Sequence, residues 1–202
     1  MAGRLPEALQ ALVEMLARLP GLGPKSALRI AMTLLKWPES ETRRLGESIS
    51  SLRDTLGICS RCRAVSATDP CAICADPDRG QDTLCIVPEW DSLLAIESGG
   101  FYDGQYFVLG GLLSPQQKID SRCLEIDSLE ERLNTGEIKE VILALGSTLE
   151  AENTASYLKN LFAKSFPDLA ITRLAQGIPL GAEVKYMDRE TLRQSLRYRQ
   201  KI

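Results

Sequence analysis

Residues 57–74 read GICSRCRAVSATDPCAIC and contain two C-x-x-C pairs that are separated by eight residues. Each pair can present two thiolates to one face of a metal ion, so two pairs can complete a closed tetrahedral site. Such a site leaves no position for water or substrate, which predicts one structural Zn²⁺ per chain. The predicted ligands are Cys59, Cys62, Cys71 and Cys74.

Two arginines lie inside the same stretch, and two other uses of the cysteines have to be weighed. Arg61 and Arg63 can partly offset the negative charge of zinc with four thiolates. The competing interpretations are two disulfides or a thiol redox pair. One C-x-x-C pair is ambiguous, whereas two at this spacing favour metal binding.

The composition is that of a soluble globular protein. The chain has 202 residues, of which 44% are hydrophobic and 25% are charged, enough for one main domain with smaller modules. No apolar run approaches the roughly 20 residues of a membrane span, and the first residues do not resemble a signal peptide. We therefore expect a cytosolic protein with no membrane partner. Because the cytosol is reducing, its six cysteines indicate metal binding and not a disulfide framework.

The absence of histidine and the uneven charge narrow the possible functions. With no histidine, Ser-His-Asp catalysis, Cys-His catalysis and H-E-x-x-H zinc sites are excluded. Residues 1–66 carry ten Lys and Arg against six Asp and Glu, whereas residues 67–202 carry fourteen against twenty-one. This asymmetry indicates nucleic acid at the basic end and a protein or a cation at the acidic end.

The basic end contains a helix-hairpin-helix pattern. Apolar residues recur at helical spacing over residues 5–19, and LPGLGPKSALRIA follows from residue 19. Gly21 and Gly23 permit a tight hairpin, and Pro24 suits the first turn of a new helix. Lys25 and Arg29 lie one turn apart, beside backbone N–H groups that can bind phosphate. The pattern predicts DNA binding that is indifferent to base sequence; an ordinary turn between two core helices is the alternative.

The rest of the chain alternates between strand and helix signals. A third helix is predicted over residues 39–56, with Gly57 placed to end it. Short apolar runs then predict buried strands at 83–87, 106–109, 141–145 and 169–172, with helices at 91–98, 128–133 and 149–164 between them. This alternation is typical of an α/β fold with a mostly parallel sheet. A basic helix within residues 187–199, capped by Asp188, ends the pattern.

Three carboxylates follow the predicted strands. Glu89 comes just after the first strand, and Glu150 and Glu152 come just after the third. Ligand sites of open α/β sheets lie beyond the carboxyl ends of the strands, so the three side chains could hold Mg²⁺ or form an acidic docking surface. Solvated glutamates favoured at a helix start are the alternative for the last two. Cys85 is expected in the core, and no role is assigned to Cys123.

The order of these parts resembles the RecR family of bacterial recombination mediators over nearly the whole chain. The resemblance rests on the hairpin sequence, the four-cysteine loop, VLGGLLSP at 108–115 and TRLAQGIPLG at 172–181. It implies that the α/β domain is a Toprim fold and that the protein is not an enzyme. It also implies action with RecO, and in some lineages RecF, to load RecA on single-stranded gaps, and assembly as a dimer or tetramer ring.

The resemblance sets the expected domains: a helix-hairpin-helix region at 1–56, a zinc finger at 57–79, a Toprim domain at 80–175 and a C-terminal segment and helix at 176–202. Three positions depart from the family pattern. GSTLEAE at 146–152 replaces Asn-Pro-Thr and Glu-Gly-Glu, Phe107 stands where the family has histidine, and Pro88 interrupts the segment leading to Glu89. Because the chain has no histidine to act as a base and Gly146-Ser147 replaces the usual loop, we expect Glu89, Glu150 and Glu152 to form a surface that docks a basic protein partner, not a catalytic site.

Two hypotheses from other functional classes remain open at this stage. A Toprim-type nuclease or primase would use the three glutamates with Mg²⁺, although Glu150-Ala151-Glu152 replaces the Asp-x-Asp pair of Toprim catalysts. A zinc-stabilised protein-interaction module would have no role on DNA. A metal-dependent nicking assay tests the first hypothesis, and a salt-dependent DNA titration tests the second.

Overall fold

The structure is a computed structural model that describes residues 5–114, 124–175 and 177–199. The chain divides into two compact units, Met1–Thr55 and Leu56–Ile202. Cys123 lies outside the described residues. Within the described part of the chain, no helix has both the length and the apolar character that crossing a membrane requires.

The first unit is helical. It consists of α1 (Glu7–Leu16), α2 (Pro24–Leu34) and α3 (Glu39–Thr55). Helix α1 is shorter than predicted, because residues 17–20 form turns that lead into the hairpin. Helices α1 and α2 pack against each other, and Ala27 and Ala31 of α2 are fully buried. The two small side chains allow the close approach on which the hairpin depends.

Helix α3 keeps its apolar side chains exposed. The leucines and isoleucine that predict this helix are Leu45, Ile49, Leu52 and Leu56, and their exposed fractions are 39%, 67%, 56% and 38%. No residue of the helix is buried. The helical period of these residues therefore predicts the helix correctly. Within the described part of the first unit, nothing covers its apolar face.

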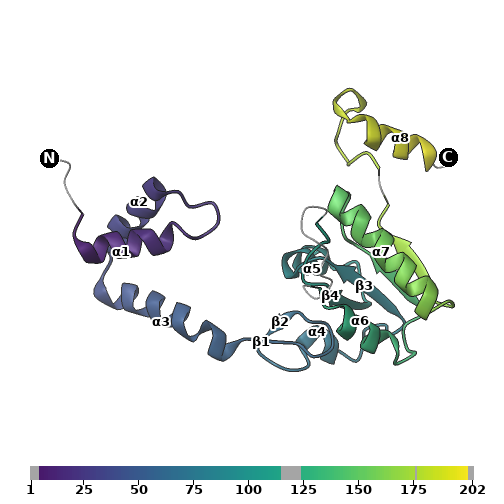
Figure 1. Cartoon of the computed structure of the whole chain (residues 1–202), viewed down its shortest axis with the longest axis horizontal. Coiled ribbons are helices and arrows are strands. Elements are labelled where there is room, and N and C mark those ends of the chain that lie inside the picture. The colour runs from purple at the N-terminus through teal and green to yellow at the C-terminus, as the bar shows by residue number, and fades with distance from the viewer. Residues whose placement is uncertain (1–4, 115–123, 176, 200–202) are drawn as a thin grey trace. The chain divides into compact units, whose positions relative to one another are not determined.

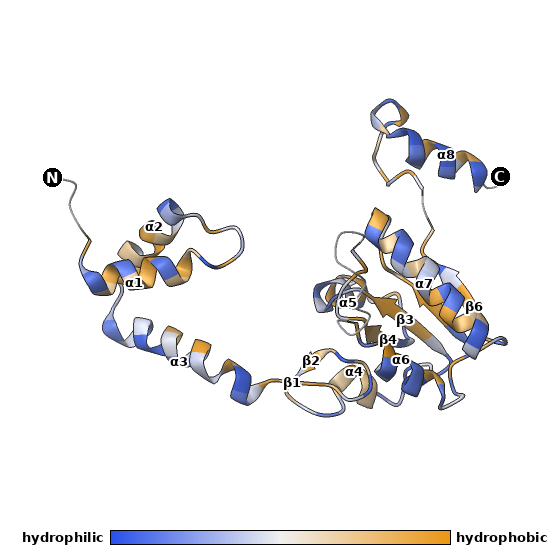
Figure 2. Cartoon of the chain, in the orientation of Figure 1, coloured by the Kyte–Doolittle hydropathy of each residue, from blue (hydrophilic) through white to orange (hydrophobic). Residues whose placement is uncertain are grey.

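The second unit is built on a parallel sheet, part of which is labelled in Figure 1. The strands are β3 (Thr83–Val87), β4 (Gln105–Val108), β5 (Glu140–Leu143) and β6 (Ala170–Arg173). Their order in the sheet is β4-β3-β5-β6, and every pair is parallel. The apolar strand β3 stands out in the hydropathy colouring of Figure 2. Strands β3 and β4 are buried almost throughout, as expected for strands that are covered on both faces, whereas the edge strand β6 is mostly exposed.

Helices cover one face of this sheet. Alternate strand residues such as Leu84, Ile86 and Phe107 point to it and pack with residues of α6 (Ile126–Leu133) and α7 (Leu149–Ser165). The period of two in a strand sends Cys85 and Val87 to the opposite face. There they pack with Leu93 of α5 (Trp90–Glu97) and with the four-cysteine loop. Cys85 is 2% exposed, as expected for a core residue.

The four-cysteine loop and the C-terminal segment add short elements to this unit. The loop contains β1 (Gly57–Ile58), β2 (Val65–Ser66) and α4 (Ala72–Ala75), with β1 and β2 antiparallel. The C-terminal segment contains η2 (Val184–Tyr186) and α8 (Arg189–Arg197). The predicted fold class is confirmed: a helical first region and a four-cysteine loop precede a Toprim-like α/β sheet with helices.

Candidate functional site

The four cysteines of the loop form one compact cluster. Their Sγ atoms all lie within 4.8 Å of one another, and all four residues are buried. Among the residues that the structure describes, this is the one group of at least three Cys, Asp or Glu side chains that is arranged to hold a metal ion. The chemistry of four thiol groups suits a soft or borderline cation such as Zn²⁺.

Short local structures hold the cysteines in place. The Cys71 thiol caps α4 by accepting a hydrogen bond from the Cys74 N–H at 3.4 Å, and the Cys71 N–H donates to Cys59 Sγ at 3.3 Å. Ser60 donates from its N–H and its hydroxyl to the Asp69 carboxylate, both at 2.8 Å. The Ser60 N–H, as the first cause, keeps the pKa of Asp69 below its usual range. The loop is thus pinned at both C-x-x-C turns.

The electrostatics of the cluster favour a cation at its centre. A hydrogen bond from the Cys74 thiol lowers the pKa of Cys62 to about 6. Burial, with a further contribution from the Cys62 charge, raises the pKa of Cys71 to about 11. The hydrogen bond that the Cys74 thiol gives to Cys62, followed by burial, raises the pKa of Cys74. A second thiolate is therefore opposed by burial and like charge, and four thiolates require a cation beside them.

The loop is joined to the sheet by polar contacts as well as by packing. The Val108 N–H donates to the Cys62 carbonyl at 2.8 Å. Arg63 forms an ion pair with Glu125, with Nε and Oε2 2.9 Å apart. Arg61 Nη1 donates to the Cys74 carbonyl at 3.3 Å. Arg63 thus ties the loop to the residue before α6, and the offsetting of thiolate charge by the two arginines stays a prediction.

The hairpin of the first unit presents an open helix start. Gly21 has φ +77°, a left-handed conformation that favours glycine. Gly23 is the N-cap of α2 with φ −82°, and no side chain caps this helix. The first N–H groups of α2 therefore have no side-chain acceptor from the N-cap. Lys25 and Arg29 are exposed and, at four-residue spacing, share one side of the helix.

The space beside these glycines is empty. A Cβ built on Gly21 or Gly23 would meet no heavy atom within 4 Å. At Gly23 the backbone angles are also ordinary for any residue. The glycine at this position is thus explained neither by strain nor by crowding within the chain. Close approach of a ligand to the backbone, as phosphate binding requires, would explain it.

The three carboxylates lie at the carboxyl edge of the sheet. Glu89 is exposed at the N-cap of α5, two residues after the end of β3. Glu150 and Glu152 lie in the first turn of α7, after β5, which is the neighbour of β3. Within the described residues the three do not form a metal-binding group. Glu152 instead forms an ion pair with Arg173 of β6, at 3.0 Å.

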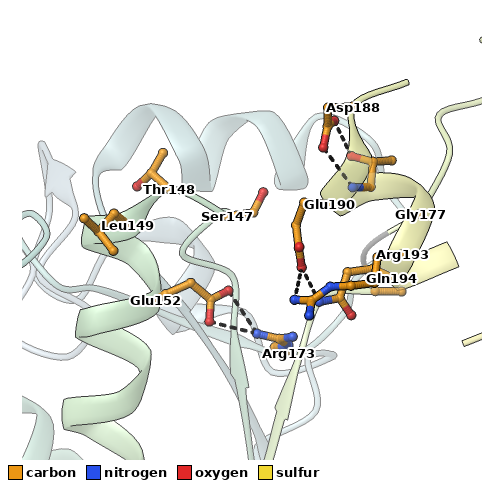
Figure 3. Close-up of a pocket in the computed structure, with 12 residues that line it drawn as sticks. Ser147, Thr148, Leu149, Glu152, Arg173, Gly177, Asp188, Glu190, Arg193 and Gln194 are labelled. Atoms are coloured by element: carbon orange, nitrogen blue, oxygen red, sulfur yellow. Dashed lines mark hydrogen bonds and ion pairs between the residues drawn. The ribbon is translucent and has the colours of Figure 1, made fainter. Parts of the chain in front are cut away.

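A pocket of about 750 Å³ links this edge to the C-terminal helix (Figure 3). One wall consists of Ser147, Thr148 and Glu152 at the start of α7, together with Arg173. The opposite wall belongs to α8 and its cap, where Glu190 accepts hydrogen bonds from Arg193 at 2.7 Å and Gln194 at 2.8 Å (Figure 3). The wall residues are Asp188, Glu190, Thr191, Arg193 and Gln194.

Four family models match successive parts of the chain. They are described as RecR helix-hairpin-helix at residues 9–52, RecR four-cysteine zinc finger domain at 56–76, Toprim domain at 82–175, and RecR C-terminal at 177–200. A relative named Recombination protein RecR from Nitratidesulfovibrio vulgaris is 62% identical over 199 residues, which is 98% of this chain and 99% of the relative.

The chain belongs to the RecR family. The protein of the same name from Maridesulfovibrio salexigens is 58% identical over 198 residues, with 98% of each chain covered. The order of RecR modules in the family models is the order of elements in this structure. The zinc finger module contains the thiol cluster, and the helix-hairpin-helix module contains the open start of α2.

Sequence reasoning missed several residues around these RecR modules. Glu125 and Arg173, which bind Arg63 and Glu152, stand at positions where no motif marks them. Arg79 is a third case, because it pairs with Glu97 of α5 and donates to the Gly104 carbonyl at 3.0 Å. Of these residues, only Arg173 could have been found from the sequence. It is the last residue of β6, and ligand sites of parallel sheets lie at the carboxyl ends of the strands.

Proposed function

We propose that this chain binds DNA without reading its base sequence, through the hairpin between α1 and α2 and the first turn of α2. The observation that carries the proposal is the uncapped start of α2 at Gly23, with exposed Lys25 and Arg29 on one side. A helix start with free N–H groups attracts phosphate, and the two cations add contacts that carry no base information.

The test compares three variants in fluorescence-anisotropy titrations with unrelated duplexes. Lys25→Ala and Arg29→Ala should each lower the salt slope by about 0.9. Gly23→Ala should also weaken binding, because a methyl group enters the space where a phosphate would approach, while the fold accepts it without a clash. Arg53→Ala, on the exposed end of α3, is the matched control. Unchanged affinity of the Lys25→Ala, Arg29→Ala double variant would refute the proposal.

In the cell, we propose, this binding serves recombinational repair in the cytoplasm. The chain would act as a mediator, not as an enzyme, and would work with a RecO protein, possibly also RecF, to load RecA on single-stranded gaps. The names of the RecR relatives and the family resemblance support this role. Measuring DNA binding with and without a purified RecO protein tests function and partnership together.

The thiol cluster is proposed to hold one structural Zn²⁺ per chain. The four buried Sγ atoms and the match to a four-cysteine zinc finger model support this assignment. Cys59, Cys62, Cys71 and Cys74 would each supply one ligand, and the bound ion would supply the positive charge that four thiolates require. No step of any reaction is assigned to it, because four protein ligands leave no open coordination position.

Glu89, Glu150 and Glu152 are proposed to dock a basic partner protein. Their position at one edge of the sheet supports a shared surface, and the Glu152–Arg173 pair gives that carboxylate a protein partner in place of a metal. Changing Glu150 and Glu152 to Gln should slow association with a RecO protein at low salt and leave DNA binding by the hairpin unaltered. Loss of a magnesium-dependent cleavage activity in this variant would favour a Toprim enzyme instead.

Self-association is the remaining part of the proposal, as a dimer or a tetramer ring. It is supported by an apolar groove of about 640 Å³ in the first unit. The groove is lined mainly by leucines and isoleucines of α1, α2 and α3, with Trp37 beside them. The exposed Ile49 and Leu52 of α3 continue the apolar surface. A second copy of the same unit would remove this surface from water.

A further inference from the structure

The C-terminal helix α8 has two chemically different faces. Gln194 is 9% exposed, and Thr191 and Ser195 on the same side are half-buried. The Ser195 hydroxyl lies 3.9 Å from the position that a Cβ on Gly177 would occupy. Arg189, Arg193 and Arg197 are exposed and follow one another at four-residue spacing, and Arg193 also lies at the rim of the pocket beside α7. The polar character of the helix is plain in Figure 2.

The three arginines form a stripe along the helix. They stand at positions i, i+4 and i+8, so successive arginine side chains leave the helix about 6 Å apart along its axis. This step is close to the distance between neighbouring phosphates in an extended nucleic-acid strand. One carboxylate, Glu190, pairs with Arg193 at 2.7 Å. The other acidic residue at this end, Asp188, is engaged as the helix cap through Thr191.

An exposed aromatic ring continues the stripe. Tyr198 follows the last turn and is 58% exposed. The Arg197 guanidinium carbon lies 5.5 Å from the centre of its ring, and Arg199 follows directly. The same pairing occurs once before the helix, where Lys185 Nζ lies 4.8 Å from the ring centre of Tyr186, which is 73% exposed. Each ring keeps most of its surface in water although it lies beside a cation.

We infer that Arg189, Arg193, Arg197, Tyr198 and Arg199, the C-terminal basic face, bind single-stranded DNA. The inference rests on the proposed DNA-binding function and adds a second contact surface to it. A cationic track bounded by an aromatic ring combines the two interactions that hold a single strand, phosphate neutralisation and base stacking. A duplex keeps its bases stacked inside, so it can use the arginines but not Tyr198. An acidic protein would use the arginines and have no need of an open ring.

The test measures anisotropy of a labelled oligo(dT) and of a blunt duplex over 50–200 mM salt. Substitution of Arg189, Arg193 and Arg197 by Gln should reduce the salt slope for oligo(dT) by about two, because each lost phosphate contact contributes about 0.7. The wild type should then lose about 20-fold more affinity than the variant over this range. The matched control replaces three exposed lysines of the sheet domain, Lys139, Lys159 and Lys164, by Gln, which changes net charge equally.

The ring is tested separately from the charge. Tyr198→Ala should weaken oligo(dT) binding by about 5- to 100-fold and leave duplex binding unchanged, whereas Tyr198→Phe should bind as the wild type does. All these side chains are exposed, so the variants should keep the fold. Equal affinities of the arginine variant and its lysine control, or an unaffected Tyr198→Ala, would overturn the inference.

A combined experiment separates this inference from the proposed hairpin site. The Lys25→Ala, Arg29→Ala variant should lose duplex affinity and keep the part of oligo(dT) binding that depends on Tyr198. If that variant loses all binding to both ligands while the α8 variants bind normally, the hairpin proposal stands and the C-terminal basic face is refuted. If only the α8 variants lose binding, the C-terminal basic face stands and the hairpin proposal fails.

Discussion

Loss of metal from the cysteine loop should destabilise the whole sheet domain, not only the loop. The perturbation is Cys71→Ser, which removes one thiolate from the cluster. Because the loop forms part of the layer over the second face of the sheet, a loop that no longer folds uncovers strand residues. The variant should therefore lose zinc and thermal stability together.

The size of the effect follows from what the loop covers. Cys85, Val87, Tyr106 and Val108 pack in one cluster with the four cysteines, and each is 6% exposed or less. Full burial of such a side chain is worth about 1.5–3 kcal/mol, so uncovering half of each costs about 3–6 kcal/mol. The hydrogen bond from the Val108 N–H to the Cys62 carbonyl adds about 1 kcal/mol. For a chain of this size, each kcal/mol corresponds to about 2–4 °C, so a total of about 4–7 kcal/mol should lower Tm by about 8–28 °C.

The assay combines zinc content per chain, calorimetry and hydrogen exchange of the Val108 amide. Cys85→Ser is the control, because it changes a buried thiol that is not a ligand: it should keep its zinc and the Val108 protection. A Cys71→Ser protein that loses its zinc while Tm shifts by less than about 2 °C would refute the reasoning. So would unchanged protection of the Val108 amide, since that amide donates to the loop itself.

Three further predictions concern other parts of the chain. Ile49→Asp should weaken self-association at least about tenfold in sedimentation experiments, because it places a charge on a surface proposed to be buried; an unchanged distribution of species would contradict it. Gly21→Ala should destabilise the first unit by about 1 kcal/mol in denaturant titrations, because φ +77° is unfavourable for alanine. The Thr191 hydroxyl and N–H lower the pKa of Asp188, so the α8 cap should persist above about pH 4 and be lost as pH falls further. An NMR pH titration of the Thr191 amide checks this direction: its chemical shift should change as Asp188 is protonated, and the change should be missing in Asp188→Asn.

The local features of this chain could be predicted from sequence because their causes lie within a few residues. The spacing of the C-x-x-C pairs indicated a four-thiol cluster, and the cysteines do converge within 4.8 Å. Short apolar runs gave all four strands of the sheet, with shifts of a residue or two at their ends. The helix cap at Asp188 was also predictable, since it needs only the Thr191 N–H three residues later.

The exposed apolar face of α3 could not be predicted from the sequence. The helical period of Leu45, Ile49 and Leu52 predicted the helix, but periodicity does not say what covers an apolar face. In this unit nothing buries these side chains. The same limit applies to Glu150 and Glu152: their place after a strand was predictable, but the pairing of Glu152 with Arg173 was not.

By itself, then, the sequence determined the longer helices, the four strands of the parallel sheet, the thiol cluster and the hairpin, because hydrogen bonds and ligand spacing within short segments select them. Only the tertiary structure decided that the cysteine loop covers one face of the sheet and that Arg63 joins it to Glu125, 62 residues away. It likewise decided that α8 forms a wall of the pocket beside α7. These arrangements depend on strand order and on the packing of surfaces that are distant in sequence, for which a local pattern carries no signal.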